Sequence, residues 1–447
     1  MRIDRVVAFT VALALALAGT ASAQNYSTDA RKIAMGGNGG DSANIASGMV
    51  DKASPYTAIV IPLGLIQIFK DGTDRFNPSK DAFDPIRAVE DISNPLHFTF
   101  GRGTTQTGQA FVSDIVNGKL NSNLLVYKGF NIPTSLAAEG LASPNIGGTI
   151  KLFKKGNSYQ GVYVGAGPYL GFNTNFGVDQ KLADLLNTGT AALCSPCNVT
   201  NAAQIQLAMA FTLGYRVKVG TGPDKRDGVY VAYNYHYLKG FKYLDENVGV
   251  RIDTNAQGQL KLPPITIPPI NPVTISGVEA SSGKGYASDI GVQVVRGFFE
   301  VGFGVNGIGN QIEWTDFQQK TFTLTALQGG LDFVEKTTPS GVTSLIVKLP
   351  VVKTANVGFQ VAGWGALASI TNGFNGTSFH GGVERQVAGP LWVRGGGRYS
   401  RGYWDPTYGF GVGKRVALDV GFYGSHANLE GKRQTAMAVS VRFNHKR

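Results

Sequence analysis

The stretch that decides the fold reads Ile205-Gln-Leu-Ala-Met-Ala-Phe-Thr-Leu-Gly-Tyr-Arg-Val-Lys-Val219. Large apolar residues alternate with small or polar residues along its whole length, which is the period of a β-strand. Strands of soluble sandwiches usually have about 5 to 6 residues, whereas about 9 to 11 residues carry a tilted strand across a bilayer. The pattern therefore predicts a transmembrane strand with its apolar face toward lipid and its polar face toward a lumen.

The first 23 residues have the features of a secretory signal. Arg2 and Arg5 form a positive end, Val6 to Ala18 an apolar core, and Ala21-Ser22-Ala23 a small-residue cleavage site. The apolar core is shorter than the roughly 20 residues of a membrane-spanning helix. We expect residues 1–23 to be a signal peptide and the mature chain to begin near Gln24.

The composition favours a barrel over a soluble enzyme. The chain contains 60 glycines, 16% charged and 10% aromatic residues, and long amphipathic helices alternating with strands, as in an α/β enzyme, are not evident. Because the basic residues behind the net charge of +11 are scattered, they do not predict a nucleic-acid surface. Basic loops could equally meet anionic lipid headgroups.

A short motif follows the signal peptide in a glycine- and serine-rich segment from Gln24 to Pro55. It consists of Ala30, Arg31, Met35, Gly36 and Gly37, and it resembles the N-terminal element of the outer-membrane long-chain fatty-acid transporter superfamily, which includes related barrels of secretion and conjugation systems. The resemblance implies an all-β fold, a transmembrane antiparallel β-barrel of about 14 strands with an N-terminal plug in the lumen. We expect residues 24–55 to form the plug and residues 56–447 the barrel. Ala53-Ser54-Pro55 stands where an Asn-Pro-Ala element is common.

The last seventy residues give the clearest meander of alternating strands. The connections at Val387–Pro390 and Lys414-Arg415 are short, while Arg401–Asp405 and Ser425–Gln434 are longer. In outer-membrane barrels the short turns face the periplasm. This orientation places the end of the opening strand, near Val219, at the periplasmic mouth.

Several inward basic residues are expected in the periplasmic half. Glu384 and Arg394 would face each other as an ion pair if their hairpin turned about Gly389. One interpretation is a lumen held together by ion pairs and hydrogen bonds. The other is a basic exit that favours an anionic head group such as a carboxylate. The residues of the predicted exit are Arg216, Lys218, Arg394 and Arg442.

The only two cysteines lie close together in Cys194-Ser-Pro-Cys197. In an exported protein they predict a local disulfide, Cys194 with Cys197, in a long outer loop. A redox site would need a thioredoxin-like βαβ context, which the sequence lacks.

A dinucleotide-binding pattern of glycines occurs at Gly302 to Gly307. It lies within an alternating strand and lacks a following helix, so we reject a nucleotide site. Asn306-Gly307 predicts a hairpin turn instead.

These features predict passive uptake of hydrophobic or amphipathic small molecules across a bacterial outer membrane, with outer-membrane lipid around the barrel. The alternative is a structural or scaffolding barrel of a secretion or conjugation system. A third possibility, an outer-membrane lipolytic enzyme, would need a serine and histidine in reach of each other, and we expect His236 and His380 to be lumen hydrogen-bond partners. No metal or cofactor is implied.

Overall fold

The computed structural model describes residues 30–36, 44–50, 59–61, 134–143, 146–188, 196–222, 224–254, 260–261, 273–327, 330–374, 376–400, 403–413, 416–425 and 434–443. The predicted signal peptide, Gly37 and Cys194 lie outside these residues. Three helices are present in the described part of the chain: α2 (Ala30–Ala34), α3 (Ser47–Val50) and α7 (Gln180–Thr188). None of these described helices is long and apolar enough to span a membrane.

Long antiparallel strands form one side of the sheet. They pair in the order β4, β5, β6, β8, β9, and β3 and β2 pair one after the other along the edge of β4 that faces away from β5. Their bounds are β2 Ser135–Ala142, β3 Ile146–Lys155, β4 Ser158–Val178, β5 Cys197–Val219, β6 Gly228–Thr254, β8 Val273–Arg296 and β9 Phe299–Leu327, while the short β7, Leu260–Lys261, pairs with the end of β6.

Shorter strands form the other side. Three of them, β10, β11 and β12, pair one after another along the far edge of β9. Each later strand then pairs with the next, and β18 pairs with β1. The bounds are β10 Gly330–Pro339, β11 Leu345–Lys348, β12 Val352–Val361, β13 Trp364–Gly373, β14 Gly376–Ala388, β15 Leu391–Ser400, β16 Tyr403–Gly413, β17 Val416–Ser425, β18 Gln434–Phe443 and β1 Ile59–Ile61.

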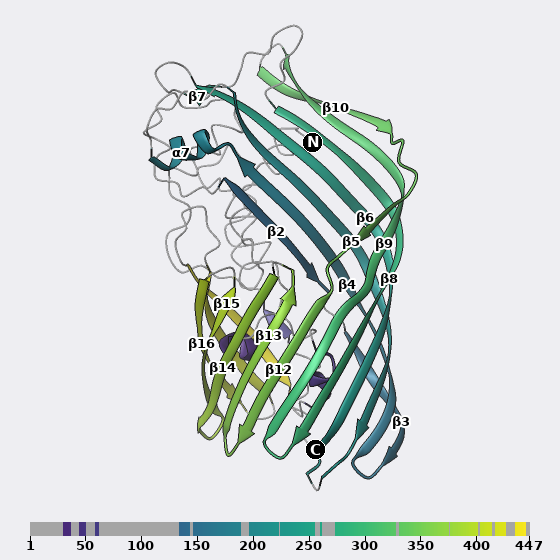
Figure 1. Cartoon of the computed structure of the whole chain (residues 1–447), viewed down its shortest axis with the longest axis vertical. Coiled ribbons are helices and arrows are strands. Elements are labelled where there is room, and N and C mark those ends of the chain that lie inside the picture. The colour runs from purple at the N-terminus through teal and green to yellow at the C-terminus, as the bar shows by residue number, and fades with distance from the viewer. Residues whose placement is uncertain are drawn as a thin grey trace.

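The sheet curls into a barrel-shaped wall (Figure 1). Counting β2 with β3, and β10 with β11 and β12, as one position each gives fourteen positions from β4's outer edge to β1 in the described part of the chain. The predicted antiparallel all-β fold is therefore confirmed, while the number of strands in a closed barrel stays a prediction. Closure between the β1 edge and the β2–β3 edge stays a prediction.

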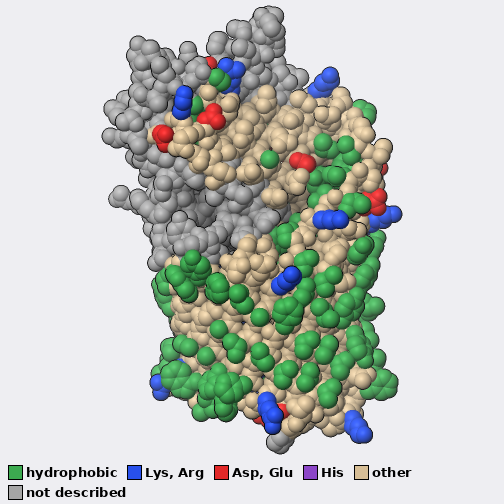
Figure 2. Space-filling view, in the orientation of Figure 1, with side chains coloured by type: hydrophobic (Ala, Val, Ile, Leu, Met, Phe, Trp, Pro, Cys, Tyr) green, Lys and Arg blue, Asp and Glu red, His purple; other side chains and the backbone are tan. Residues whose placement is uncertain are grey.

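Strand β5 shows why the chain takes this form. It includes the predicted stretch and begins eight residues earlier, at Cys197. From Ala208 to Val219, outward apolar side chains alternate with buried inward ones, and Leu213 keeps 58% of its surface exposed. Comparable outward side chains on the neighbouring strands form a band over the lower half of the molecule (Figure 2). The band includes Phe211 and Tyr215, Tyr233, Tyr235 and Tyr237, Ile290, Val292 and Val294, Val301 and Phe303, and Val383, Val393, Phe410 and Leu418.

The long strands continue well beyond this band. Strand β9 has 29 residues, about three times the number that a tilted strand needs to cross a bilayer. Since the band lies at the end where the short turns are, the upper parts of β4 to β9 extend on the side of the long connections (Figures 1 and 2). Not every connection there is long: the predicted loop Arg401–Asp405 was wrong, because β16 already begins at Tyr403.

The predicted hairpin turn at Asn306-Gly307 was also wrong. Strand β9 runs through these residues, and Gly307 and Gly309 have φ angles of +75° and +67°. The register with β8 shifts beside them, between Tyr286 and Ile290. Positive-φ glycines serve bulges as well as turns, and here they bend a continuous strand.

Candidate functional site

The concave side of the sheet carries the candidate site. Near the short-turn end it is lined by buried polar and charged side chains, and farther along the strands it is lined by apolar ones. On β5 this change occurs within one strand, from Lys218 and Arg216 through Thr212 to Ala210 and Ala208. The interior therefore has a polar inner layer and an apolar outer layer.

Four charged groups form the centre of the polar layer. Glu384 and Arg394 occupy opposite positions on β14 and β15, and Arg394 Nε lies 3.1 Å from Glu384 Oε2. Arg394 Nη1 lies 2.8 Å from Asp419 Oδ1 on β17. Arg31 of α2 completes the chain, since its Nε donates to Glu384 Oε2 at 2.9 Å. These ion pairs alternate positive and negative groups, and three of the side chains are at most 3% exposed.

A glycine makes the contact between Arg394 and Asp419 possible. These residues lie on β15 and β17, so their side chains must cross β16. Gly411 stands at the crossing, where a Cβ would come within 2.2 Å of Asp419 Oδ1 and 2.7 Å of Arg394 Nη1.

Helix α2 lies directly on the backbone of the sheet. Cβ atoms at Gly382 and Gly396 would lie 2.2 Å from the oxygen and 2.6 Å from the carbonyl carbon of Met35. Gly36, with a φ of +74°, has equally little room. The small residues of the motif and the glycines of β14 and β15 therefore allow a backbone-to-backbone approach that side chains would prevent.

Three hydrogen bonds fix this segment to the strands beneath it. Ala30 N donates to Ser440 Oγ at 3.1 Å, and Thr407 Oγ1 donates to Ala34 O at 3.0 Å. His380 Nδ1 donates to Gly36 O at 2.8 Å, while its Nε2 pairs with Ser378 Oγ.

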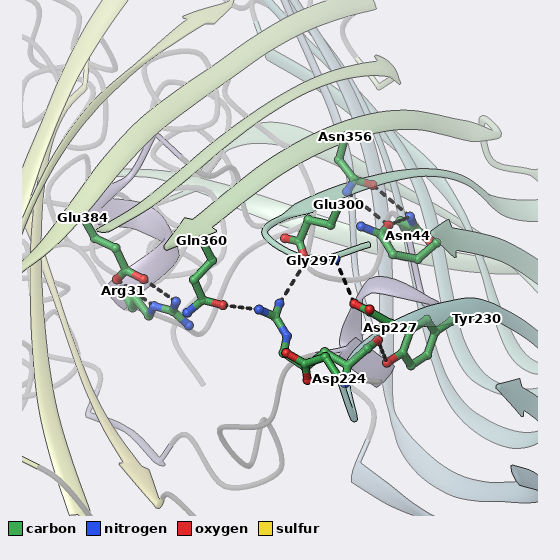
Figure 3. A network of polar contacts seen from close by, with 12 residues as sticks. Arg31, Asn44, Asp224, Asp227, Tyr230, Gly297, Glu300, Asn356, Gln360 and Glu384 are labelled. Carbon is green, nitrogen blue, oxygen red and sulfur yellow. Dashed lines mark hydrogen bonds and ion pairs between the residues drawn. The ribbon is translucent and has the colours of Figure 1, made fainter. Parts of the chain in front are cut away.

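The second N-terminal helix, α3, attaches to the long strands that lie opposite those contacted by α2. Asn44, just before α3, donates through Nδ2 to Gln293 Oε1 and Asn356 Oδ1, each at 2.8 Å (Figure 3). Apolar residues around α3, among them Val50, pack against Tyr230 and Val295 on β6 and β8. Since α2 contacts β15 to β18 and α3 contacts β6 and β8, the N-terminal segment contacts both sides of the interior.

Two of the predicted basic residues, Arg216 and Lys218, are engaged by the wall itself. Arg216 donates to Tyr233 O at 2.9 Å and Asn234 Oδ1 at 2.7 Å, and lies over the Tyr163 ring. Lys218 bonds the carbonyl of Lys225 and lies 5.2 Å from the Tyr230 ring centre. Arg442 occupies β18 opposite Ala417, and its side chain lies outside the described ones.

The turn between β5 and β6 reaches across the inner mouth. Arg226 Nη1 donates to Gln360 Oε1 of β12 at 2.7 Å, and Nη2 lies 3.3 Å from Glu300 Oε2 of β9. Asp227 Oδ1 accepts from Gly297 N at 2.8 Å (Figure 3). We call residues 220–227 the inner-mouth turn, and these contacts tie it to strands β9 and β12.

A cluster of packed apolar side chains, which we call the apolar chamber, occupies the outer layer. Its centre is Trp314, which stacks on Tyr243 with ring centres 5.5 Å apart. Gly240 and Gly283 leave space for the indole, because a Cβ at either would lie 2.6 to 2.7 Å from it. The remaining buried residues are Tyr169, Ala208, Ala210, Leu238, Ala280, Ala287, Ile312 and Phe317.

A pocket of about 180 Å³ adjoins this chamber. Its walls come from β4, β5 and Tyr243 on one side and from Val347, Leu349 and Pro350 on the other. Leu349 donates its backbone N–H to Asn310 O of β9, and its side chain packs close to Gly171 of β4, so this residue lies between β9 and β4. The pocket lies just beyond the outer edge of the apolar band.

The histidines are part of cross-strand networks. His236 Nδ1 lies 2.8 Å from Thr212 Oγ1, and its Nε2 lies 2.7 Å from Asp289 Oδ2. Asp289 Oδ1 in turn accepts from Gly307 N at 2.9 Å, which anchors the bulge of β9 to β8.

The cysteine loop joins α7 to β5. Cys197 is disulfide-bonded and buried, and its predicted partner Cys194 lies outside the described residues. Asp179 Oδ2 accepts from Asn198 N at 2.7 Å, next to the start of α7. The loop is thus held at both of its described ends.

The sequence did not predict Arg226, nor the partners of Arg31 and Asp289. The alternation places Asp419 and Gln206 on the inward face of their strands, and this was the available signal for them. It does not show which distant side chain each one meets.

No family model and no curated protein matches the chain. Among solved structures, it resembles the Ralstonia pickettii toluene transporter TbuX, with 11% identity over 73% of this chain and 99% of that one and a TM-score of 0.34. It also resembles the Pseudomonas putida toluene transporter TodX, with 11% identity, 70% and 88% coverage and a TM-score of 0.35. The ferric-catecholate import receptor Fiu from E. coli K12 matches with 9% identity, 69% and 80% coverage and a TM-score of 0.20.

Proposed function

We propose that this protein is an outer-membrane β-barrel for passive uptake of hydrophobic or amphipathic small molecules. The observation that carries the proposal is the pairing of an apolar outer band with an apolar chamber inside the same wall, at the side of the long connections. The band suits lipid. The pocket beside the chamber offers a place for an apolar solute after it leaves the outer surface.

The N-terminal segment is the gate in this proposal. Below the chamber, a solute meets α2, α3 and the polar inner layer. An apolar solute would gain no apolar contact there while it moved past the charged groups. Movement of α2 from its glycine-lined seat would open the interior along β14 to β17. Residues 24–55 therefore act as the plug.

The inward basic residues form the frame of the inner end rather than a free anion site. Arg394 is shared between two carboxylates, and Arg216 and Lys218 bond to main-chain oxygens. Uptake of acidic ligands should therefore be little changed when Arg216 and Lys218 are replaced by glutamine. A large loss specific to acidic ligands would restore the interpretation as a basic exit.

Uptake can be tested in vesicles that contain the purified full chain. Toluene entry should exceed that of protein-free vesicles, and Ala208→Phe should slow it because this side chain points into the chamber. Met209→Phe is the matched control on the neighbouring lipid-facing position, which is 38% exposed. Equal rates for both variants would show that solutes do not pass through the chamber.

The apolar chamber also separates this proposal from the alternatives. A scaffolding barrel has no need of an apolar pocket near the outer loops. The order Thr212–His236–Asp289 is that of a hydrolase triad, but Thr212 is only 3% exposed, so a lipid ester could not reach its hydroxyl. Purified protein should not hydrolyse esters, and hydrolysis that disappears in His236→Ala would show an enzyme.

A further inference from the structure

The pocket beside the chamber contains a hydrogen-bonding group that the protein leaves without a partner. Gln206 lines the pocket from β5, and its residue surface is only 3% exposed. Its Oε1 atom has no hydrogen-bond partner among the described residues. A buried amide oxygen without a hydrogen-bond partner is costly, so the site favours a molecule that donates a hydrogen bond to it.

The other polar groups around the pocket are already satisfied or exposed. Gln204 Nε2 donates to Asp245 Oδ2 at 2.9 Å, and Tyr243 Oη donates to the same oxygen at 3.2 Å. Lys348 and Asn173 lie at the exposed side of the pocket. Gln206 is therefore the buried group that a ligand would contact.

The shape of the pocket sets the size of such a ligand. A cavity of about 150 Å³ accommodates a benzene ring in a protein interior, and this pocket measures about 180 Å³. Val347, Leu349, Pro350 and the Tyr243 ring provide apolar contact. The remaining volume is enough for one or two further heavy atoms, placed beside the Gln206 amide.

We propose that this pocket selects small ring compounds that carry a neutral hydroxyl group, such as phenol, over the bare hydrocarbon. A hydroxyl both donates and accepts, so it can bond Oε1 or Nε2 whichever way the amide is turned. The inference rests on the proposed function, because it names the class of solute that the same interior binds first.

Calorimetry on the full chain in lipid nanodiscs, with empty nanodiscs subtracted, tests this with phenol, toluene and benzoate as the probes. Phenol should bind about five- to tenfold more tightly than toluene, the effect of one additional hydrogen bond. Gln206→Leu should remove that preference while toluene still binds. Gln318→Leu, the same change at an exposed position of β9, should leave the preference intact.

Each other outcome has its own meaning. If toluene binds and phenol binds no better, or if Gln206→Leu leaves the ratio unchanged, selection by Gln206 is wrong and the uptake function stands. If benzoate binds best and loses this in Lys348→Gln, the pocket selects charge instead of hydroxyl. If neither phenol nor toluene binds to wild-type protein that migrates as folded in unheated gels, the proposed interior route itself is wrong.

Discussion

Replacing Arg31 with glutamine should release the N-terminal segment while leaving the wall folded. Arg31 pairs with Glu384, which also pairs with Arg394, so its loss removes one positive charge from a largely buried chain of ion pairs. The strands keep their ladders of backbone hydrogen bonds, which do not involve this side chain. Only the seating of α2 should weaken.

The size of the effect follows from burial. Removing one partner of a fully buried ion pair costs about 3 to 5 kcal/mol. Arg31 is 17% exposed, and Glu384 keeps Arg394, so about 2 kcal/mol is the better expectation. At about 1.4 kcal/mol per factor of ten, the segment should be detached roughly 30 times more often.

Proteolysis by proteinase K measures this population when the segment opens and closes faster than it is cut. Trypsin is unsuitable because the substitution removes one of its sites. Arg385→Gln, an equal change of charge next to Glu384 but over the Trp364 ring, should digest like the wild type. The double variant Arg31→Gln/Glu384→Gln removes one charge of each sign, so its segment should be less detached than the sum of the two single changes predicts. Wild-type digestion of Arg31→Gln, or strict additivity, would refute the reasoning.

Three further outcomes are expected. Gly396→Ala should also loosen the N-terminal segment, because its Cβ would meet the Met35 backbone, whereas Gly395→Ala, which has open space, should not; digestion rates compare the two. Leu213→Arg should lower the unfolding free energy in lipid, measured by urea titration, by about 2 to 4 kcal/mol if this residue lies near the bilayer centre. Ala202→Arg, at an exposed position above the band on the same strand, should change this free energy little. Equal effects of the two substitutions would contradict the membrane position. Arg226→Ala should free the inner-mouth turn at a cost of about 1 kcal/mol and raise ion conductance in planar bilayers, unlike Lys225→Ala; identical conductance in both would mean that the turn does not restrict the mouth.

The sequence was informative wherever the answer depended on one strand alone. The alternation from Ile205 to Val219 predicted which side chains of β5 face outward, because side chains of a strand point to opposite faces at a period of two. The opposite positions of Glu384 and Arg394 belong to one hairpin, so their turn sets their register. In such cases neighbours in space are also near in sequence.

The partners of the site residues could not be predicted from the sequence, because these contacts join segments that are remote in the chain. Arg31 and Glu384 are 353 positions apart, and Asp419 meets Arg394 across an intervening strand at Gly411. At Asn306-Gly307 the same local residues suit a hairpin turn or a bulge. Pairing of β9 with β8 on one side and β12 on the other decides for the bulge.

The seat of α2 also has a consequence for the order of assembly. Helix α2, which is synthesised early, finds its binding surface on β15 to β18, which are synthesised last, and β1 likewise pairs with β18. Contacts this distant in sequence form late, since the loop between them must first be closed. A chain that lacks β15 to β18 therefore has no docking surface for α2, so this helix can take its place only after the last strands are present.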